Sequence, residues 1–113
     1  MTATQVVPVG AVPAPRRGGT RGSRWRALLE SRWLDRLAEL TDLSVAYHDT
    51  DARESQRLLS RRAVVARYAL AETDKALHRL ATGEFGRCED CAGDIPHARL
   101  LAEPEARYCE HCA

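Results

Sequence analysis

The sequence predicts a mostly α-helical protein, in which a long antiparallel helical hairpin is followed by a small C-terminal globule built around four cysteines. Three observations lead to this prediction. Only 5% of the 113 residues are aromatic while 29% are charged, a composition too poor in large apolar side chains for a thick β-sandwich core. Two segments repeat apolar residues with the spacing of packed helices. All four cysteines fall in the last quarter of the chain.

Residues 1–22 are rich in proline, glycine and small apolar residues and show neither a helical nor a strand period. Such a segment cannot bury enough apolar area to offset its chain entropy, so we predict a disordered tail. Residues 1–26 carry five arginines and no acid, which leaves −4 for the remaining 87 residues because the whole chain sums to +1. These arginines could contact phosphates. The rest of the chain is not basic, so we expect no sequence-specific DNA binding.

Residues 23–82 are predicted to form an antiparallel coiled-coil hairpin with its tip near 48–52. The first helix, near 24–47 with Ser23 as a candidate cap, has its seam at Leu29, Trp33, Arg36, Leu40, Leu43 and Tyr47. The second, near 52–82, has its seam at Leu59, Ala63, Ala66, Leu70, Thr73, Leu77 and Leu80. The alternating spacing of four and three residues keeps each seam facing one partner helix. Gly83 is placed to end the second helix.

Residues 83–113 contain two C-x2-C pairs, Cys88 with Cys91 and Cys109 with Cys112, separated by 17 residues. This spacing is typical of structural zinc sites. Each tight turn supplies two thiolates to one tetrahedral ion, and four thiolates leave no open coordination position. We therefore predict one structural Zn²⁺ bound by these four cysteines, on which the folding of the segment depends.

Other interpretations of the cysteines stay open. Two disulfides would suit a secreted scaffold, but the first residues lack the basic start of a secretory signal and are interrupted by prolines. A redox C-x2-C pair would suit a thioredoxin-like βαβ pattern, which the sequence lacks. His97 or His111 could replace one cysteine ligand, although His111 lies within the second pair and could not easily bind beside both neighbours.

The stretch ALHRLATGEFGRCEDCAGDIPHARLLAEPEARYCEHC, residues 76–112, resembles the DksA/TraR zinc-finger proteins, whose finger is of the four-cysteine type. The likeness lies in the Gly-x-Phe-Gly-x-Cys approach (Gly83, Phe85, Gly86, Cys88), in Ile95-Pro96, in Arg99-Leu100 and in Pro104 before the second pair. With the preceding hairpin, the resemblance extends to most of residues 24–112.

This resemblance implies a bacterial transcription regulator that binds RNA polymerase directly. In this family the hairpin enters the secondary channel, acidic residues at its tip act near the catalytic centre, and the zinc globule orients the hairpin. Here the tip carries Asp49 and Asp51. When the second Asp of the family pattern Asp-x-x-Asp-x-Ala is aligned with Asp51, His48 stands in place of the first Asp and Arg53 in place of the Ala. An alternative for the two aspartates is a simple capping turn of the second helix.

A further departure concerns ppGpp, which the best-known member binds with basic residues. The resemblance places Glu72 and Glu103 at two of these positions, and the chain ends at Ala113 before the helix that supplies another. Acids repel a multiply charged phosphate, so we expect no tight ppGpp binding.

Four arginines make the start of the second helix basic: Arg57, Arg61, Arg62 and Arg67. We expect them to be solvated and paired with Glu39 and Asp42 of the first helix, or else to contact the polymerase.

The sequence shows no Ser-His-Asp arrangement, no glycine-rich phosphate loop and no membrane-spanning apolar stretch, so we predict a cytoplasmic protein that is not an enzyme. Two other functions stay open beside the polymerase-binding regulator. One is a zinc-ribbon adaptor that binds some other protein, and the other is a thiol-based sensor that releases zinc on oxidation.

Overall fold

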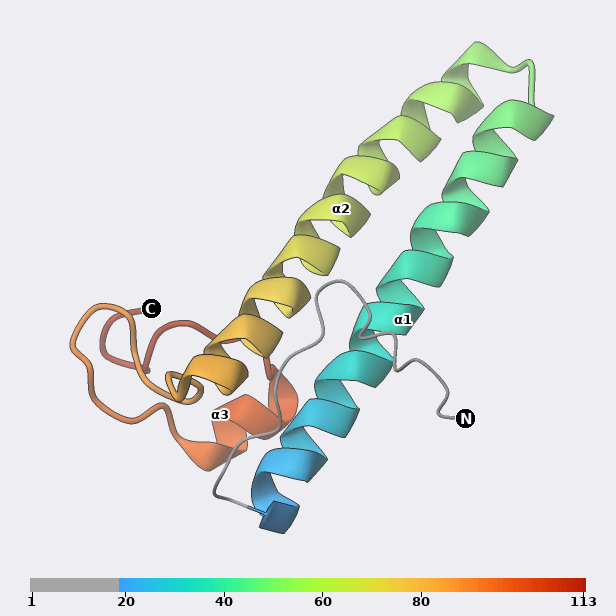
Figure 1. Ribbon diagram of the computed structural model, residues 1–113. Coiled ribbons are helices and arrows are strands. Elements are labelled where there is room, and N and C mark those ends of the chain that lie inside the picture. Colours follow the sequence, from blue (N-terminus) through green and yellow to red (C-terminus); the bar gives the residue numbers. More distant parts are fainter. Residues whose placement is uncertain (1–18) are drawn as a thin grey trace, which may run out of the picture.

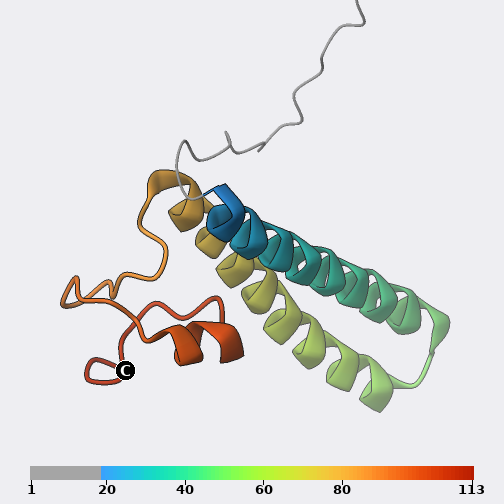
Figure 2. The ribbon, with the colours of Figure 1, turned by 90° about the horizontal axis from the view of Figure 1, so that it is seen from below.

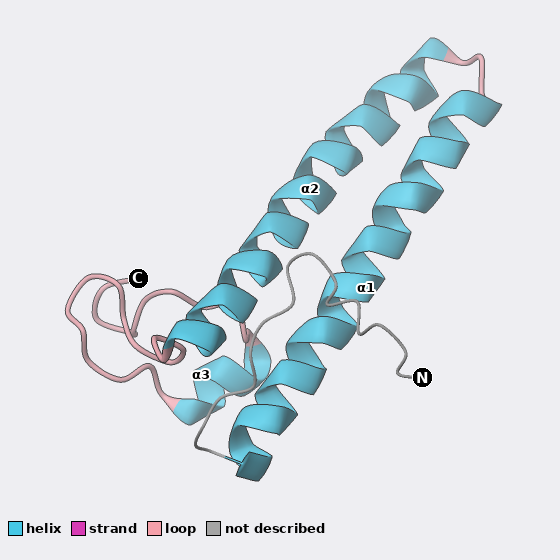
Figure 3. Ribbon diagram, viewed as in Figure 1, coloured by secondary structure: helices cyan, strands magenta, loops and turns pink. Residues whose placement is uncertain are grey.

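The computed structural model describes residues 19–113, which contain three helices: α1 (Gly19–Asp49), α2 (Arg53–Thr82) and α3 (His97–Ala102). The two long helices lie antiparallel, and the C-terminal segment with α3 packs beside their base (Figure 1). The rest of the described chain is loop apart from one isolated antiparallel bridge between Arg87 and Asp94 (Figure 3). The predicted fold class is therefore confirmed. Within residues 19–113, no helix contains an apolar stretch that could span a bilayer.

The first helix begins earlier than the sequence predicts. It starts at Gly19, so Ser23 lies inside the helix and does not cap it. The ring of Trp25 contacts two rings of the C-terminal segment, with centroids 5.0 Å from Phe85 and 5.7 Å from His97. These contacts stabilise the first turns of α1, although glycine has a weak helix propensity. The sequence predicts a disordered tail for residues 1–22. Residues 1–18 lie outside the described part of the chain, and residues 19–22 belong to α1.

The two predicted seams face each other in the structure. Leu29 on α1 and Ala66 and Thr73 on α2 are buried, and most of the other seam positions are half-buried. Tyr47, the last seam residue before the tip, is 36% exposed because the hairpin opens onto solvent there. A pair of helices has only one contact face, so partial burial is the expected outcome.

The second helix ends where the sequence predicts. Gly83 adopts a left-handed conformation with φ of 81°, and its N–H donates to the carbonyl of Arg79. The N–H groups of Glu84 and Phe85 donate to the same carbonyl at 2.8 and 3.1 Å. This termination turns the chain sideways, and the C-terminal segment therefore lies on one side of the hairpin (Figure 2).

Candidate metal centre

Two loops bring the cysteine pairs together. In the first, the N–H of Cys88 donates to the carbonyl of Gly93 at 2.7 Å, and the N–H of Ile95 donates to that of Gly86 at 2.8 Å, so the chain doubles back around Cys91. The second loop is joined to the first by the N–H of Glu89, which donates to the carbonyl of Arg107 at 2.8 Å. Backbone hydrogen bonds thus hold the two C-x2-C turns side by side.

The four sulfur atoms form one cluster. The Sγ atoms of Cys88, Cys91, Cys109 and Cys112 all lie within 4.8 Å of one another. The Sγ atoms of Cys91 and Cys109 are 3.7 Å apart. A tetrahedral zinc with sulfur at about 2.3 Å places its ligands about 3.8 Å apart, so the cluster has the size that one such ion requires. The geometry fits four thiolates around a single metal.

The pKa values of the cysteine thiols are also consistent with a cation bound among them. Backbone N–H groups, that of Cys91 first, lower the pKa of Cys88 to about 6. The thiol of Cys109 is the main cause that raises the pKa of Cys112. Four crowded thiols resist full ionisation because like charges repel, and a bound cation removes that repulsion. Neither His97 nor His111 joins the cluster among the described residues.

The apolar core around the cluster is small. It consists of buried Cys88, Ile95, Leu100, Ala106 and Cys109, with Trp25, Phe85, Tyr108 and Cys112 packed against it. A core of this size rarely holds a fold alone, and small domains commonly depend on a metal instead. The ring of Trp25 belongs to α1, so this core also joins the C-terminal segment to the hairpin.

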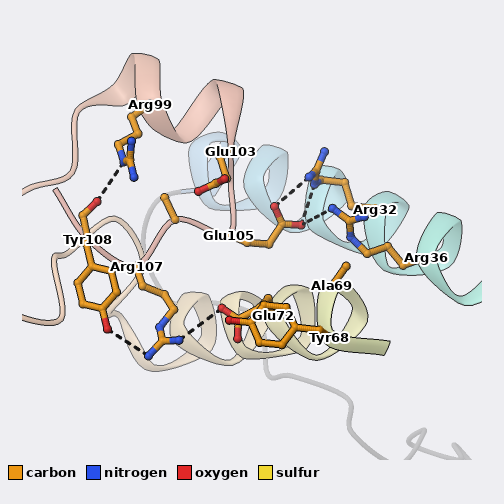
Figure 4. Close-up of a pocket in the computed structure, with 11 residues that line it drawn as sticks. Arg32, Arg36, Tyr68, Ala69, Glu72, Arg99, Glu103, Glu105, Arg107 and Tyr108 are labelled. Atoms are coloured by element: carbon orange, nitrogen blue, oxygen red, sulfur yellow. Dashed lines mark hydrogen bonds and ion pairs between the residues drawn. The ribbon is translucent and has the colours of Figure 1, made fainter. Parts of the chain in front are cut away.

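A carboxylate that sequence reasoning missed links this segment to both long helices. Glu105 is 8% exposed. Arg32 of α1 donates to it from Nε at 2.8 Å and from Nη2 at 2.9 Å (Figure 4). The hydroxyl of Thr73 on α2 donates to the same carboxylate at 2.7 Å. Burial raises the pKa of Glu105, but the hydrogen bonds from Arg32 and Thr73 outweigh it and leave the pKa below its ordinary value.

This network explains the two polar residues of the predicted seam. The Nε of Arg36 donates to the hydroxyl of Thr73 at 3.3 Å, and its Nη2 lies 3.8 Å from Glu105. Arg36 and Thr73 interrupt the apolar pattern because a carboxylate from the C-terminal segment faces them. Two polar residues facing each other across a seam were the signal in the sequence, but only the fold shows that Glu105 is their partner.

A second set of ion pairs ties the first cysteine loop to α2. Glu89, between Cys88 and Cys91, lies 3.6 Å from Arg79 of α2 and 3.0 Å from Arg107. Arg107 also lies 3.6 Å from Glu72 of α2 (Figure 4). These ion pairs connect the cysteine loops to the hairpin.

The predicted tip aspartates lie at the far end of the hairpin. Asp49 ends α1 and Asp51 lies in the loop before α2, which is the end remote from the cysteine loops (Figure 1). Both are exposed, and neither side chain makes a hydrogen bond or ion pair with any part of residues 19–113.

The capping interpretation of these aspartates is wrong. The N-cap of α2 is Ala52, which makes no side-chain cap hydrogen bond. The turn is instead closed by Thr50, whose hydroxyl accepts from the N–H of Ala52 at 3.2 Å and whose carbonyl accepts from the side chain of Gln56 at 2.9 Å. Thr50 fixes the loop, so the carboxylates of Asp49 and Asp51 stay directed to solvent.

The predicted pairing of the α2 arginines is also wrong. Arg57, Arg61, Arg62 and Arg67 are all exposed, and within residues 19–113 none forms an ion pair with Glu39 or Asp42. The weak attraction between exposed charges does not repay the entropy of fixing two long side chains. These arginines therefore remain available to a partner.

Comparison with known proteins agrees with this geometry. Residues 83–113 match the family described as the prokaryotic dksA/traR C4-type zinc finger. This segment is thus similar to the zinc finger of the DksA/TraR family. The resemblance that the sequence predicts is thus confirmed, and the sulfur cluster lies within the matched segment.

Two individual proteins extend the likeness beyond the DksA/TraR finger. The solved structure of the transcription factor DksA2 from Pseudomonas aeruginosa superposes with a TM-score of 0.77, covering 84% of this chain and 81% of that chain at 24% identity. At this identity, the match shows a shared fold. An uncharacterized protein of Aquifex aeolicus (strain VF5) is 41% identical over 59 residues, which span 52% of this chain and 41% of that protein.

Proposed function

We propose that this chain is a cytoplasmic transcription regulator that binds RNA polymerase directly and catalyses no reaction itself. The hairpin enters the secondary channel and the DksA/TraR finger orients it at the base. The observation that carries the proposal is a long hairpin with two unpaired carboxylates at its tip, fixed at its other end to a finger of this family. The fold shared with the transcription factor DksA2 supports it.

In this proposal, one structural Zn²⁺ is held by Cys88, Cys91, Cys109 and Cys112. The ion supplies the stability that the small core lacks, and the four thiolates close its coordination shell. The pairs of Glu89 with Arg79 and Arg107 then transmit the order of the metal loop to α2. The zinc therefore sets the direction of the hairpin and takes no part in chemistry at its tip.

The proposed action of the tip is electrostatic. Asp49 and Asp51 have no internal partner among residues 19–113, so their charge is available to a bound Mg²⁺ or to basic loops of the polymerase. Thr50 between them holds the loop in one shape. Asp51 occupies the second Asp position of the family pattern, whereas His48 replaces the first Asp and Asp49 lies one residue beyond it.

The test is retention of core RNA polymerase on the immobilised full chain at physiological salt. We expect the wild type and the double variant Asp49→Asn/Asp51→Asn to retain the enzyme equally, because the hairpin and finger are unchanged. Only the wild type should alter transcription from a sensitive promoter. Absence of retention by the wild type would contradict the proposal and favour an adaptor that binds another protein.

A further inference from the structure

A groove lies between α1 and α2 near the tip, away from the finger. It encloses about 350 Å³, and all the residues that line it belong to the hairpin. Its apolar lining includes Leu40, Leu59 and Ala63. Tyr47 and Val64 also line it, and they are 36% and 61% exposed. The groove is therefore an open apolar surface on a part of the protein that the finger does not cover.

The groove follows from the small size of Ala63. This residue occupies a seam position of α2, where neighbouring turns carry Leu59 and Ala66. A methyl group does not fill the space between two helices that are also held apart by leucines, so a hollow remains beside Tyr47. We expect a larger apolar side chain at position 63 to occupy part of this hollow. The existing residue keeps it open.

The charges around the groove have one sign. Among the residues that line it, Arg67 and His48 are the basic ones and no aspartate or glutamate is present. Arg67 is exposed and makes no ion pair within residues 19–113. An apolar side chain with a negative charge beside it would complement this groove and Arg67.

A second groove on the hairpin gives the contrast. It is lined by Glu39, Leu43, Arg61, Arg62 and Val65. Here one carboxylate lies among two arginines, so this groove has the same formal charge of +1 as the first but already contains an acid. Arg62 and Arg67 are both exposed arginines of the same helix, yet only Arg67 lies in a groove without an acid.

We propose that the groove over Ala63 is a docking site for an acidic polypeptide segment of RNA polymerase. An apolar side chain of that segment occupies the hollow beside Tyr47, and a neighbouring carboxylate pairs with Arg67. This inference rests on the proposed function and specifies which face of the hairpin contacts the polymerase.

The experiment measures the affinity of the full chain for core polymerase with two pairs of matched variants. Ala63→Leu fills the groove, and Ala71→Leu makes the same change at an exposed position of α2 outside both grooves. Arg67→Glu reverses the charge at the groove, and Arg62→Glu makes the same reversal in the second one. Circular dichroism establishes that each variant keeps its helices.

We expect Ala63→Leu and Arg67→Glu each to weaken binding by about tenfold or more, and both controls to stay within about twofold. Equal weakening by Arg62→Glu and Arg67→Glu would show that only total charge matters and would overturn the docking site. Binding of a single-stranded oligonucleotide that depends on Arg67 would assign the groove to nucleic acid, and would also overturn it. If the wild type does not bind the polymerase at all, both the docking site and the proposed function are overturned. This outcome differs from the two above, in which the wild type still binds the polymerase.

Discussion

Arg32 and Glu105, 73 residues apart in sequence, form a two-pronged hydrogen-bonded ion pair with distances of 2.8 and 2.9 Å. The side chain of Glu105 is 9% exposed and that of Arg32 is 32% exposed, so the pair is shielded mainly on the carboxylate side. Because Thr73 donates to the same carboxylate, one side chain joins α1, α2 and the C-terminal segment. This contact is one of those that hold the C-terminal segment against the hairpin.

The first prediction concerns the charge of Glu105. Glu105→Gln keeps the shape but weakens the bonds from Arg32 and places an amide NH₂ group among donors. We expect the free energy of unfolding to fall by about 1–3 kcal/mol, below the range for a fully buried pair because Arg32 is partly exposed. Urea unfolding followed by circular dichroism measures this.

The matched control is Glu103→Gln, two residues away. Glu103 is exposed and makes no hydrogen bond or ion pair through its side chain within residues 19–113. The free energy of unfolding of Glu103→Gln should differ from that of the wild type by less than about 0.5 kcal/mol. Equal losses in the two variants would show that general charge, and not the pair with Arg32, causes the effect.

The second prediction is a pH dependence. The pKa of Glu105 in the folded protein lies below its ordinary value of 4.5. The folded state therefore favours the ionised form, so its contribution is complete above about pH 4.5 and is lost as the pH falls through the lowered pKa. The stability difference between the wild type and Glu105→Gln should shrink as the pH is lowered below 4.5. A difference that stays constant down to pH 3 would contradict the assignment, and loss of metal in acid affects both proteins alike.

The hairpin could be predicted from the sequence because its signal is local and repeated. Leu29 and Ala66 lie where their spacing placed them, and Gly83 ends α2 through its left-handed conformation. The cysteine cluster was equally predictable, since two C-x2-C turns restrict the possible geometry to one site.

What the sequence could not supply depended on contacts between distant segments. Glu105 follows a proline in a loop and carries no periodic signal, yet it is a central link between the segments. The early start of α1 depends on Trp25 meeting Phe85 across the fold. The prediction that the α2 arginines pair with acids of α1 was wrong for a different reason. Opposite charges on neighbouring exposed helices attract too weakly to hold their side chains in one geometry.

The third prediction concerns the metal. Cys91→Ser removes one of four thiolates, and the remaining three cannot close a tetrahedral site. We expect loss of stoichiometric zinc by elemental analysis and loss of amide-exchange protection over residues 84–112, since binding and folding share their free energy. The distal parts of α1 and α2 should keep their protection. A zinc-free protein whose C-terminal segment still melts cooperatively would rule out the structural role of the ion.

The fourth prediction concerns the end of α2. Gly83 has φ of +81°, and a Cβ built there meets no atom within 4 Å. The cost of Gly83→Ala is therefore backbone strain alone, about 1 kcal/mol. Gly83→Asn should cost less, because asparagine tolerates the left-handed region. Thermal unfolding of the two variants tests this, and equal stability of Gly83→Ala and the wild type would show that the turn does not need its left-handed residue.

The last prediction concerns ppGpp and the cavity of about 390 Å³ between the hairpin and the finger. Four arginines line it, and three of them, Arg32, Arg36 and Arg107, already face carboxylates, while Arg99 donates to the carbonyl of Tyr108. Arg32 is bound to Glu105, and Arg107 lies 3.6 Å from Glu72 and 3.0 Å from Glu89. A phosphate would have to displace these carboxylates and remain close to them, which electrostatic repulsion opposes.

We therefore expect no saturable binding of ppGpp that depends on this chain when the nucleotide is titrated into its complex with polymerase. Glu103→Arg should raise the affinity, because Glu103 lines the same cavity and makes no ion pair within residues 19–113. Saturable binding by the wild-type complex, lost when the chain is omitted, would show that the carboxylates yield to the phosphates.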